Sequence, residues 1–146
     1  MRMGLRIGAI TVDCRDPGPL ARFWAAVLDW VISRDEDPEW VVEPRAGTRD
    51  DSVVADLLFI KVPETKTIKN RLHFDLRPED QAVEVARLEA LGATRIDIGQ
   101  GERAWVVMAD PEGNEFCVQP AHPPEIRAQW LTAYESYRPV RESVPD

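Results

Sequence analysis

The stretch RLHFDLRPEDQAVEVARLEALGA, from Arg71 to Ala93, decides the fold because its order of elements also occurs earlier in the chain. Its first six residues alternate between polar and apolar side chains, which is the period of a strand with one face on a core. The segment 78–92 then has the pattern of a helix, with Pro78 near its start, acidic residues in its first turn and Gly92 at its end. The stretch therefore predicts a strand that leads directly into a helix.

The same order opens the chain. Residues 7–14, IGAITVDC, alternate in the same way. Asp16 and Pro17 suit the start of a helix, because Asp can cap free backbone N–H groups and Pro is tolerated at the first helical position. Apolar residues then follow at the spacing of an amphipathic helix: Leu20, Phe23, Trp24, Val27 and Leu28. Asp29 stands where the second copy has Gly92, and we expect it to adopt the left-handed conformation that Asp tolerates.

Each strand and helix pair precedes three more strand candidates. They lie at 31–33, 40–43 and 55–62 in the first half, and at 94–98, 104–109 and 115–119 in the second. Asp13 and Asp75 are 62 residues apart, and Leu28 and Leu91 are 63 apart, so the two halves align with a one-residue adjustment. We predict an α+β domain over 1–120, built from two tandem βαβββ modules at about 7–62 and 70–120.

The remaining residues, 121–146, form a C-terminal helical extension in our interpretation. Apolar residues in this segment recur at helical spacing: Ile126, Trp130, Leu131 and Tyr134. We expect this helix to pack on the body of the protein or on a partner subunit.

Composition limits the classes of partner and compartment. The net charge is −8 and the basic residues are scattered, which disfavours nucleic acid and anionic membranes as partners. Cys14 and Cys117 match neither a disulfide framework nor a CxxC motif, so we expect reduced thiols. The sequence shows no secretory signal and no membrane span, and we predict a cytoplasmic protein.

Four stretches carry a family resemblance in their order along the chain: DCRDPGPLARFWAAVLDW, KNRLHFDL, EVARLEALGA and MADPEGNEFCVQP. Together with the two modules they resemble the vicinal oxygen chelate superfamily, of the glyoxalase/bleomycin-resistance type, and in particular its glyoxalase-like domain branch. The resemblance covers about residues 7–120. It implies a curved mixed sheet around a cavity, a small-molecule ligand and a homodimer. It also implies lyase or isomerase activity, or drug binding without chemistry, because one fold serves many functions.

The resemblance also implies where a metal would be held. In that superfamily a divalent metal is typically bound by side chains on the first and last strand of each module. The matching positions here are Ala9, Phe59 or Ile60, His73 and Cys117. Alanine, phenylalanine and isoleucine cannot coordinate a metal, and a thiol stands where a carboxylate is expected. His73 is the only retained ligand of the family type, so we expect no metal and no other cofactor.

Strand parity and the resemblance together predict a polar set that faces the cavity: Thr11, Asp13, Arg71, His73, Asp75, Glu115, Cys117 and Gln119. His73 is the candidate catalytic residue, as an acid or base beside a carboxylate, with Arg71 or Gln119 orienting a substrate oxygen. Two alternatives stay open at this point. His73 could instead be a structural hydrogen-bonding residue, and Arg71 could pair with Asp75 and exclude it.

Two further pairs have both a chemical and a structural interpretation. Cys117 near His73 could ionise to a nucleophilic thiolate, or it could be a small buried apolar residue. Asp13 and Asp75 could form a paired-carboxylate site, or each could accept hydrogen bonds from the turn that follows its strand. The sequence therefore predicts a protein that binds a small organic molecule, and it leaves open whether the molecule is converted or only sequestered.

Overall fold

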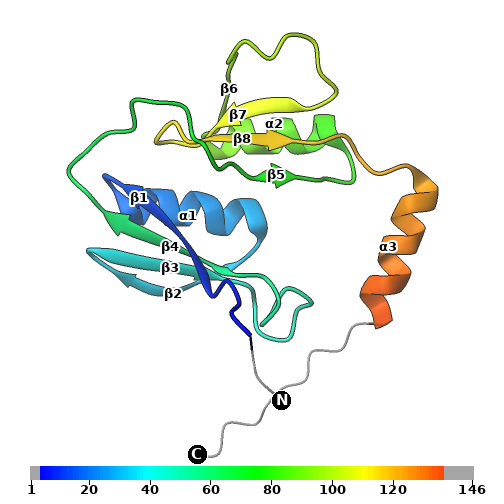
Figure 1. Cartoon of the computed structure of the whole chain (residues 1–146), viewed down its shortest axis with the longest axis horizontal. Coiled ribbons are helices and arrows are strands. Elements are labelled where there is room, and N and C mark those ends of the chain that lie inside the picture. The colour runs from blue at the N-terminus through cyan, green and yellow to red at the C-terminus, as the bar shows by residue number, and fades with distance from the viewer. Residues whose placement is uncertain (1–3, 137–146) are drawn as a thin grey trace, which may run out of the picture.

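The computed structural model describes residues 4–136, except for the side chains of Tyr134 and Ser136. The first module contains β1 (Ala9–Cys14), α1 (Pro17–Leu28), β2 (Val31–Glu36), β3 (Glu39–Glu43) and β4 (Asp56–Lys61) (Figure 1). The second contains β5 (Asp75–Leu76), α2 (Gln81–Leu91), β6 (Thr94–Arg95), β7 (Val106–Ala109) and β8 (Glu115–Val118), and α3 (Pro124–Ser136) follows. The predicted α+β fold of two βαβββ modules and a C-terminal helix is confirmed.

The two modules have the same sheet topology. One four-stranded sheet has the order β1-β4-β3-β2 and the other has the order β5-β8-β7-β6. In each sheet the first strand of the module runs parallel to the last, and the other neighbours are antiparallel. The register places Asp13 opposite Ile60, and Asp75 opposite Cys117. The described strands thus form two separately hydrogen-bonded mixed sheets rather than one continuous sheet.

The strands β5 and β6 fall furthest short of their predicted ranges. The alternation indicates a strand from Leu72, but β5 contains only Asp75 and Leu76, and β6 ends at Arg95. Just before the predicted strand, the backbone N–H of Asn70 donates to the Glu115 side chain at 2.9 Å. The alternation of polar and apolar residues indicates which side chains face a core. It does not indicate whether each backbone N–H and C=O group pairs with a neighbouring strand.

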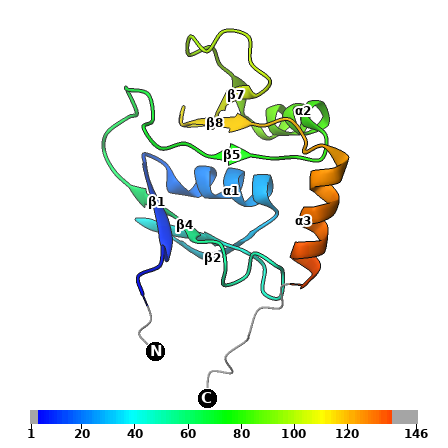
Figure 2. The same cartoon turned by 45° about the vertical axis from the view of Figure 1, so that its right-hand side comes forward.

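The core sits around α1, which lies between the first sheet and β5 in both views (Figures 1 and 2). The Trp24 ring makes edge contacts with Phe74 and Phe116, each at 5.3 Å between centroids. Phe116 and Val118 belong to this buried cluster, as the parity of their strand predicts. Burial of a large aromatic ring contributes roughly 1.5–3 kcal/mol, so these contacts join the two modules into one core.

The helix ends combine confirmed predictions with two corrections. Asp29 ends α1 with φ of 55°, and Gly92 ends α2 with φ of 112°, as the sequence indicates. Asp16 occupies the cap position of α1, but its side chain makes no capping hydrogen bond. The second helix begins at Gln81 rather than near Pro78, because the Asp80 carboxylate accepts the N–H of Val83 and fixes the start there.

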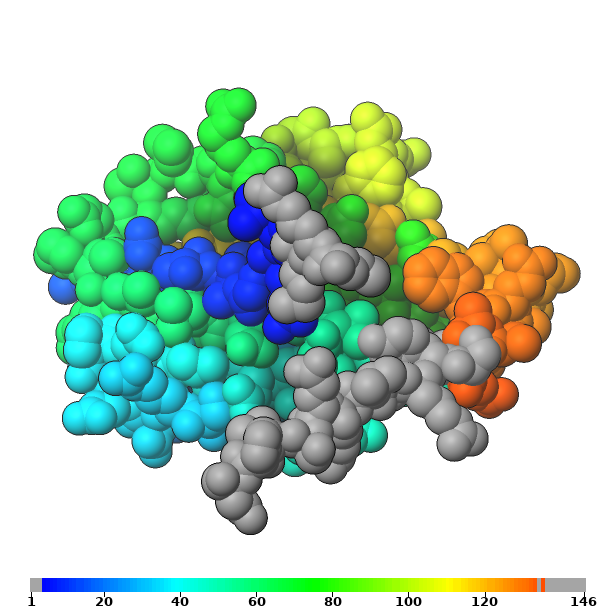
Figure 3. Space-filling model, turned by 60° about the horizontal axis from the view of Figure 1, so that its bottom comes forward, coloured from blue at the N-terminus to red at the C-terminus, as the bar shows by residue number. Residues whose placement is uncertain are grey.

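The predicted C-terminal helix is present as α3, at one end of the molecule (Figure 3). Its described apolar side chains are exposed rather than buried in the core: Trp130 is 63% exposed and Leu131 is 45% exposed. An ion pair between Arg127 and Glu79 links the helix to the second module. The Tyr134 side chain and residues 137–146, part of the predicted extension, lie outside the described residues.

Within residues 4–136, none of the helices combines the length and the apolar character that crossing a membrane requires.

Candidate functional site

A cleft of about 270 Å³ lies between the two modules, with β1 on one side and residues 70–74 on the other. Five of the residues predicted to face the cavity line it: Thr11, Asp13, Arg71, His73 and Glu115. Its remaining lining, which the sequence did not assign to a site, consists of Ile10, Val12, Trp24, Asn70, Leu72, Phe74, Asp110 and Asn114. The cleft therefore has apolar walls and polar groups that converge from both modules.

Three predicted residues do not line this cleft. Asp75, two residues after His73, and its register partner Cys117 lie on the second sheet beside the His73 side chain. Gln119 follows the end of β8, where its backbone N–H donates to the Leu76 carbonyl at 2.8 Å. The structure thus brings Asp75 and Cys117 next to the cleft and leaves Gln119 at the far end of its strand.

The first-module side of the cleft offers hydroxyl and carboxylate groups but no metal ligand of the expected kind. Thr11 and Asp13 are exposed on one face of β1. Phe59 is fully buried in the core, so Ile60, opposite Asp13, is the β4 residue of that pair on the open face. Neither Ile60 nor the exposed methyl group of Ala9 can coordinate a metal.

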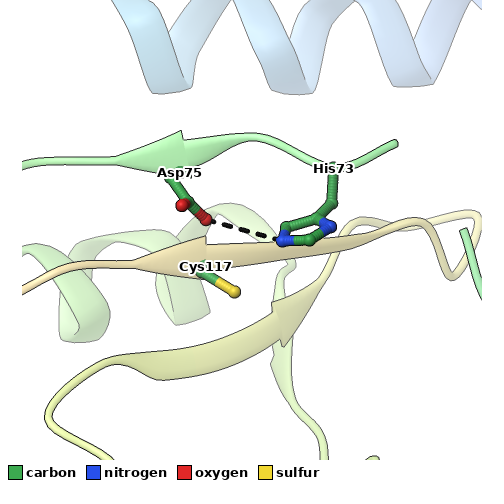
Figure 4. A group of neighbouring side chains, drawn as sticks. All are labelled: His73, Asp75 and Cys117. Carbon is green, nitrogen blue, oxygen red and sulfur yellow. Dashed lines mark ion pairs between the residues drawn. The ribbon is translucent and has the colours of Figure 1, made fainter. Parts of the chain in front are cut away.

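His73, Asp75 and Cys117 form the densest chemical cluster near the cleft (Figure 4). The distance from His73 Nε2 to Asp75 Oδ1 is 3.7 Å, and the potential ligand atoms of all three residues lie within 4.8 Å of one another. Asp75 therefore pairs with His73, and among the described residues no ion pair joins it to Arg71. This arrangement supports the hypothesis in which a carboxylate sits beside the imidazole.

Both cysteines lie in surroundings that keep the thiol protonated. Burial raises the pKa of Cys117, and the nearby Asp75 charge and a hydrogen bond from the thiol to Asp75 raise it further. Burial and then the charge of Glu112 raise the pKa of Cys14 to about 12. The Cys14 Sγ donates to the Ile60 carbonyl at 3.6 Å. These surroundings disfavour the interpretation of Cys117 as a thiolate nucleophile.

Glu115 is already engaged by the protein. Lys66 Nζ lies 2.7 Å from Glu115 Oε1, and the N–H of Asn70 donates to Oε2. Burial raises the pKa of Glu115, but the hydrogen bonds from Lys66 and Asn70 outweigh it and leave the pKa below its usual range. The carboxylate ties the segment between the modules to β8, so its position at the cleft is fixed by structure.

Asp110 is a buried carboxylate in the lining that sequence reasoning missed. It is 4% exposed and accepts hydrogen bonds from Trp24 Nε1 at 3.1 Å and from Asn114 Nδ2 at 2.9 Å. The backbone N–H groups of Glu112 and Asn114 also donate to it. Burial raises its pKa, while these hydrogen bonds oppose the shift. The available signal was the DPEGN turn, where an Asp and a following Asn commonly bond across the turn.

The side chains present do not fit the divalent metal that the fold resemblance implies. Its four expected positions are occupied by Ala9, Ile60, His73 and Cys117, so the first module supplies no ligand. In the part of the chain that the structure describes, the cluster that could hold a cation is His73, Asp75 and Cys117, all from the second module.

Comparison with solved structures shows the same fold at low sequence identity. An enzyme of the glyoxalase/bleomycin resistance protein/dioxygenase family from Burkholderia phytofirmans is 19% identical, with a TM-score of 0.59 over 81% of this chain and 100% of that chain. TnmS3, an antibiotic binding protein from a Streptomyces species, is 16% identical, with a TM-score of 0.56 over 83% of this chain and 100% of that one. The oxidase ChaP-H2 is 18% identical, with a TM-score of 0.56 over 83% and 96%.

None of the curated proteins matches this chain in sequence. The family model described as the glyoxalase-like domain matches residues 9–119, which span both modules from β1 to the end of β8. The chain therefore belongs to the glyoxalase-like domain family, within the vicinal oxygen chelate superfamily.

Proposed function

We propose that the cleft binds a small organic molecule with an apolar body and at least one oxygen function. The observation that carries this proposal is the convergence of Arg71, His73 and Thr11 from two modules on one cleft with apolar walls. A guanidinium group and an imidazole can hydrogen-bond a carbonyl or carboxylate, while Ile10 and Phe74 contact carbon atoms. The cleft volume of about 270 Å³ lies just below the usual range for ligand pockets, so it suits a small ligand.

Proton transfer by His73 is the chemistry that we propose for this cleft, as part of a lyase or isomerase reaction. The Asp75 carboxylate, 3.7 Å from Nε2, can orient the imidazole. A proton on Nε2 directed at Asp75 leaves the Nδ1 lone pair as the acceptor for a substrate proton. Arg71 would hold the substrate oxygen on which negative charge develops.

Sequestration without chemistry is the second candidate, and the state of two carboxylates favours it. Glu115 is paired with Lys66, and Asp110 is saturated with hydrogen bonds, so neither is available to exchange a proton with a ligand. The fold is shared with TnmS3, which is an antibiotic binding protein. In this case His73 would donate or accept a hydrogen bond to the ligand and the ligand would leave unchanged.

A ligand screen by thermal shift tests the binding proposal, because a ligand of the folded state raises its stability by mass action. Carboxylic acids, ketones and antibiotics are the probes. We expect a hit to stabilise the parent and to lose most of its effect in Arg71→Ala and in His73→Ala. Arg103→Ala is the matched control, because Arg103 lies outside the cleft over the Trp105 ring. A hit that stabilises Arg71→Ala and His73→Ala fully would contradict the proposal.

Incubation of a confirmed ligand with the protein separates the two candidates. Consumption by the parent, with a loss of at least about 100-fold in rate for His73→Ala, supports proton-transfer catalysis. Recovery of the ligand unchanged after long incubation supports sequestration.

We also propose that the chain forms a homodimer in which α3 contacts the partner. Ile126, Trp130 and Leu131 expose apolar surface on this helix, while His122 stacks on Trp130 at 5.6 Å. Light scattering should give twice the chain mass for the parent and less for Trp130→Glu. A monomeric parent at high concentration would rule the dimer out.

A further inference from the structure

We propose that His73, Asp75 and Cys117 form a binding site for a thiophilic divalent cation such as Zn²⁺, held entirely by the second module. This site differs from the family arrangement, because it uses no residue of the first module and includes Asp75 and a sulfur ligand. It does not depend on which molecule occupies the cleft, and a His73 imidazole that binds the cation through Nε2 would not act as the proton-transfer base at the same time.

The backbone already gathers the three side chains. His73 and Asp75 are two residues apart, so they extend on the same side of their segment, and Asp75 is directly opposite Cys117 in the parallel register. Figure 4 shows the Asp75 side chain on β5 and the His73 side chain on the segment before it, both reaching toward β8, from which Cys117 extends. Sheet register thus sets the positions of Asp75 and Cys117, while His73 lies in the irregular segment just before β5.

The distances fit a cation after a small side-chain adjustment. Bonds of about 2.0–2.3 Å to Zn²⁺ place neighbouring ligand atoms roughly 3.3–3.6 Å apart in a tetrahedron. The His73 Nε2 to Asp75 Oδ1 distance is 3.7 Å, and all three ligand atoms lie within 4.8 Å of one another. The side chains of His73 and Asp75 are 39% and 56% exposed, so they can rotate to bring their ligand atoms closer to the buried sulfur of Cys117.

The ligand types select the class of cation. A thiolate, an imidazole and a carboxylate together favour Zn²⁺ or a neighbouring late transition metal over Mg²⁺ or Ca²⁺, which prefer all-oxygen sites. Three protein ligands also leave a fourth position free, as in zinc sites that bind water or a substrate oxygen. His73 lines the cleft, so that position lies at the edge of the cleft.

A hydrogen-bonded trio without an ion is the competing account. There the Cys117 thiol donates to Asp75 and His73 pairs with the same carboxylate. Metal binding replaces the thiol proton: the S–H bond breaks, a sulfur–metal bond forms and one proton is released to solvent. The two accounts therefore differ in whether the sulfur ever bonds to a metal.

Cobalt titration of the chelator-stripped, full-length protein distinguishes them. We expect one equivalent of Co²⁺ to produce a thiolate-to-cobalt charge-transfer band, and Zn²⁺ to displace it. Cys117→Ser should abolish the band. His73→Ala and Asp75→Asn should each weaken binding by more than the roughly 10–100-fold that loss of an outer-shell partner costs. Cys14→Ala is the matched control, since Cys14 faces the Ile60 carbonyl in the core and should leave the band unchanged.

A second readout covers the case in which Cys117→Ser fails to fold. Zn²⁺ should protect Cys117 of the parent from alkylation, as mapped by mass spectrometry, without changing the modification of Cys14. Absence of a charge-transfer band, or a band lost in Cys14→Ala and kept in Cys117→Ser, would overturn the proposal. Arg71→Ala should bind Co²⁺ normally, so failure of the metal site and failure of the cleft proposal are separable.

Discussion

Glu112 Oε1 accepts the backbone N–H of Asp16 at 2.7 Å, so the turn between β7 and β8 holds the start of α1 in the other module. The second carboxylate oxygen accepts the N–H of Arg15 at 2.9 Å. Pro17 and Pro19 bring no N–H groups to the first turn of α1, and the two amides just before the helix are satisfied by this carboxylate. The DPEGN turn thus joins the modules through hydrogen bonds from two backbone amides of the first module to the Glu112 side chain.

Glu112→Ala should therefore destabilise the protein by about 1–2 kcal/mol, because two backbone donors lose a charged acceptor. Urea unfolding monitored by tryptophan fluorescence measures this loss as a lower midpoint at an unchanged slope. Glu102→Ala is the control, since it removes an exposed carboxylate from the exposed segment before β7. Equal urea midpoints for Glu112→Ala and Glu102→Ala would show that the hydrogen bonds to the Glu112 carboxylate contribute nothing to stability.

The duplicated architecture was predictable because its signals are local. Alternation over 9–14 and the apolar stripe of α1 each follow from the geometry of one element. The positive φ of Asp29 was likewise inferred from aligning the helix end with Gly92, and the structure confirms it. The start of β5 was misplaced because alternation extends to Leu72, whereas pairing with β8 begins at Asp75, and pairing depends on a strand about 40 residues away in sequence.

The candidate site was predictable to the extent that strand parity determines it. Parity places His73 and Asp75 on one side and Cys117 opposite Asp75, and the structure brings the three together. Parity could not show that Glu115 is bound by Lys66, since that pairing depends on the path of the segment between the modules. It also could not show that Gln119 lies beyond the cleft, because parity fixes a face and not a position along it.

Lys66 and Glu115 should make stability depend on pH in the acid range. The pKa of Glu115 in the folded protein lies below its ordinary value of 4.5, so its contribution to stability is fully present above that value. The contribution is lost as the pH falls through the folded pKa, where the carboxylate protonates. At pH 7, Glu115→Gln should cost about 1.5–3 kcal/mol, the range for hydrogen bonds to charged groups.

The measurement is the difference in free energy of unfolding between the parent and Glu115→Gln, at pH 7 and at several values below 4.5. We expect this difference to narrow steadily on acidification. Glu79→Gln serves as the control, because that side chain is 77% exposed and its pair with Arg127 should contribute little at any pH. A difference in free energy of unfolding that stays constant with pH would contradict the proposal that the ionised Glu115 carboxylate stabilises the folded protein.

Trp24→Phe should destabilise the protein although an aromatic ring remains in the core. The substitution removes the Nε1–H that donates to Asp110 Oδ2 at 3.1 Å, and a buried carboxylate loses a donor at a cost of about 1–3 kcal/mol. Trp130→Phe, at an exposed position on α3, is the matched control and should be nearly neutral. Comparable losses in the two variants would mean that the hydrogen bond is not the cause.

Asp110→Asn tests the same contact from the other side. An amide of the same shape presents N–H groups to donors from Trp24 and Asn114, so we expect a loss of about 2–3 kcal/mol in urea unfolding. Combined with Trp24→Phe, the loss should be smaller than the sum of the two single losses, since both remove one hydrogen bond. Strict additivity would indicate that the two side chains do not interact.

The two thiols should react slowly in the folded protein and in a fixed order. Thiolate is the reactive form, and burial raises the pKa of both groups, to about 12 for Cys14. We expect Ellman's reagent at pH 7.5 to modify Cys117, which is 7% exposed, slowly and Cys14, which is 1% exposed, more slowly still.

In urea both cysteines should react at the rate of a free cysteine. Raising the pH should keep speeding the native reaction through the alkaline range, because the folded pKa values lie above the ordinary thiol value of 9.0. Native Cys117 reacting as fast as unfolded Cys117 would restore the thiolate nucleophile as a hypothesis.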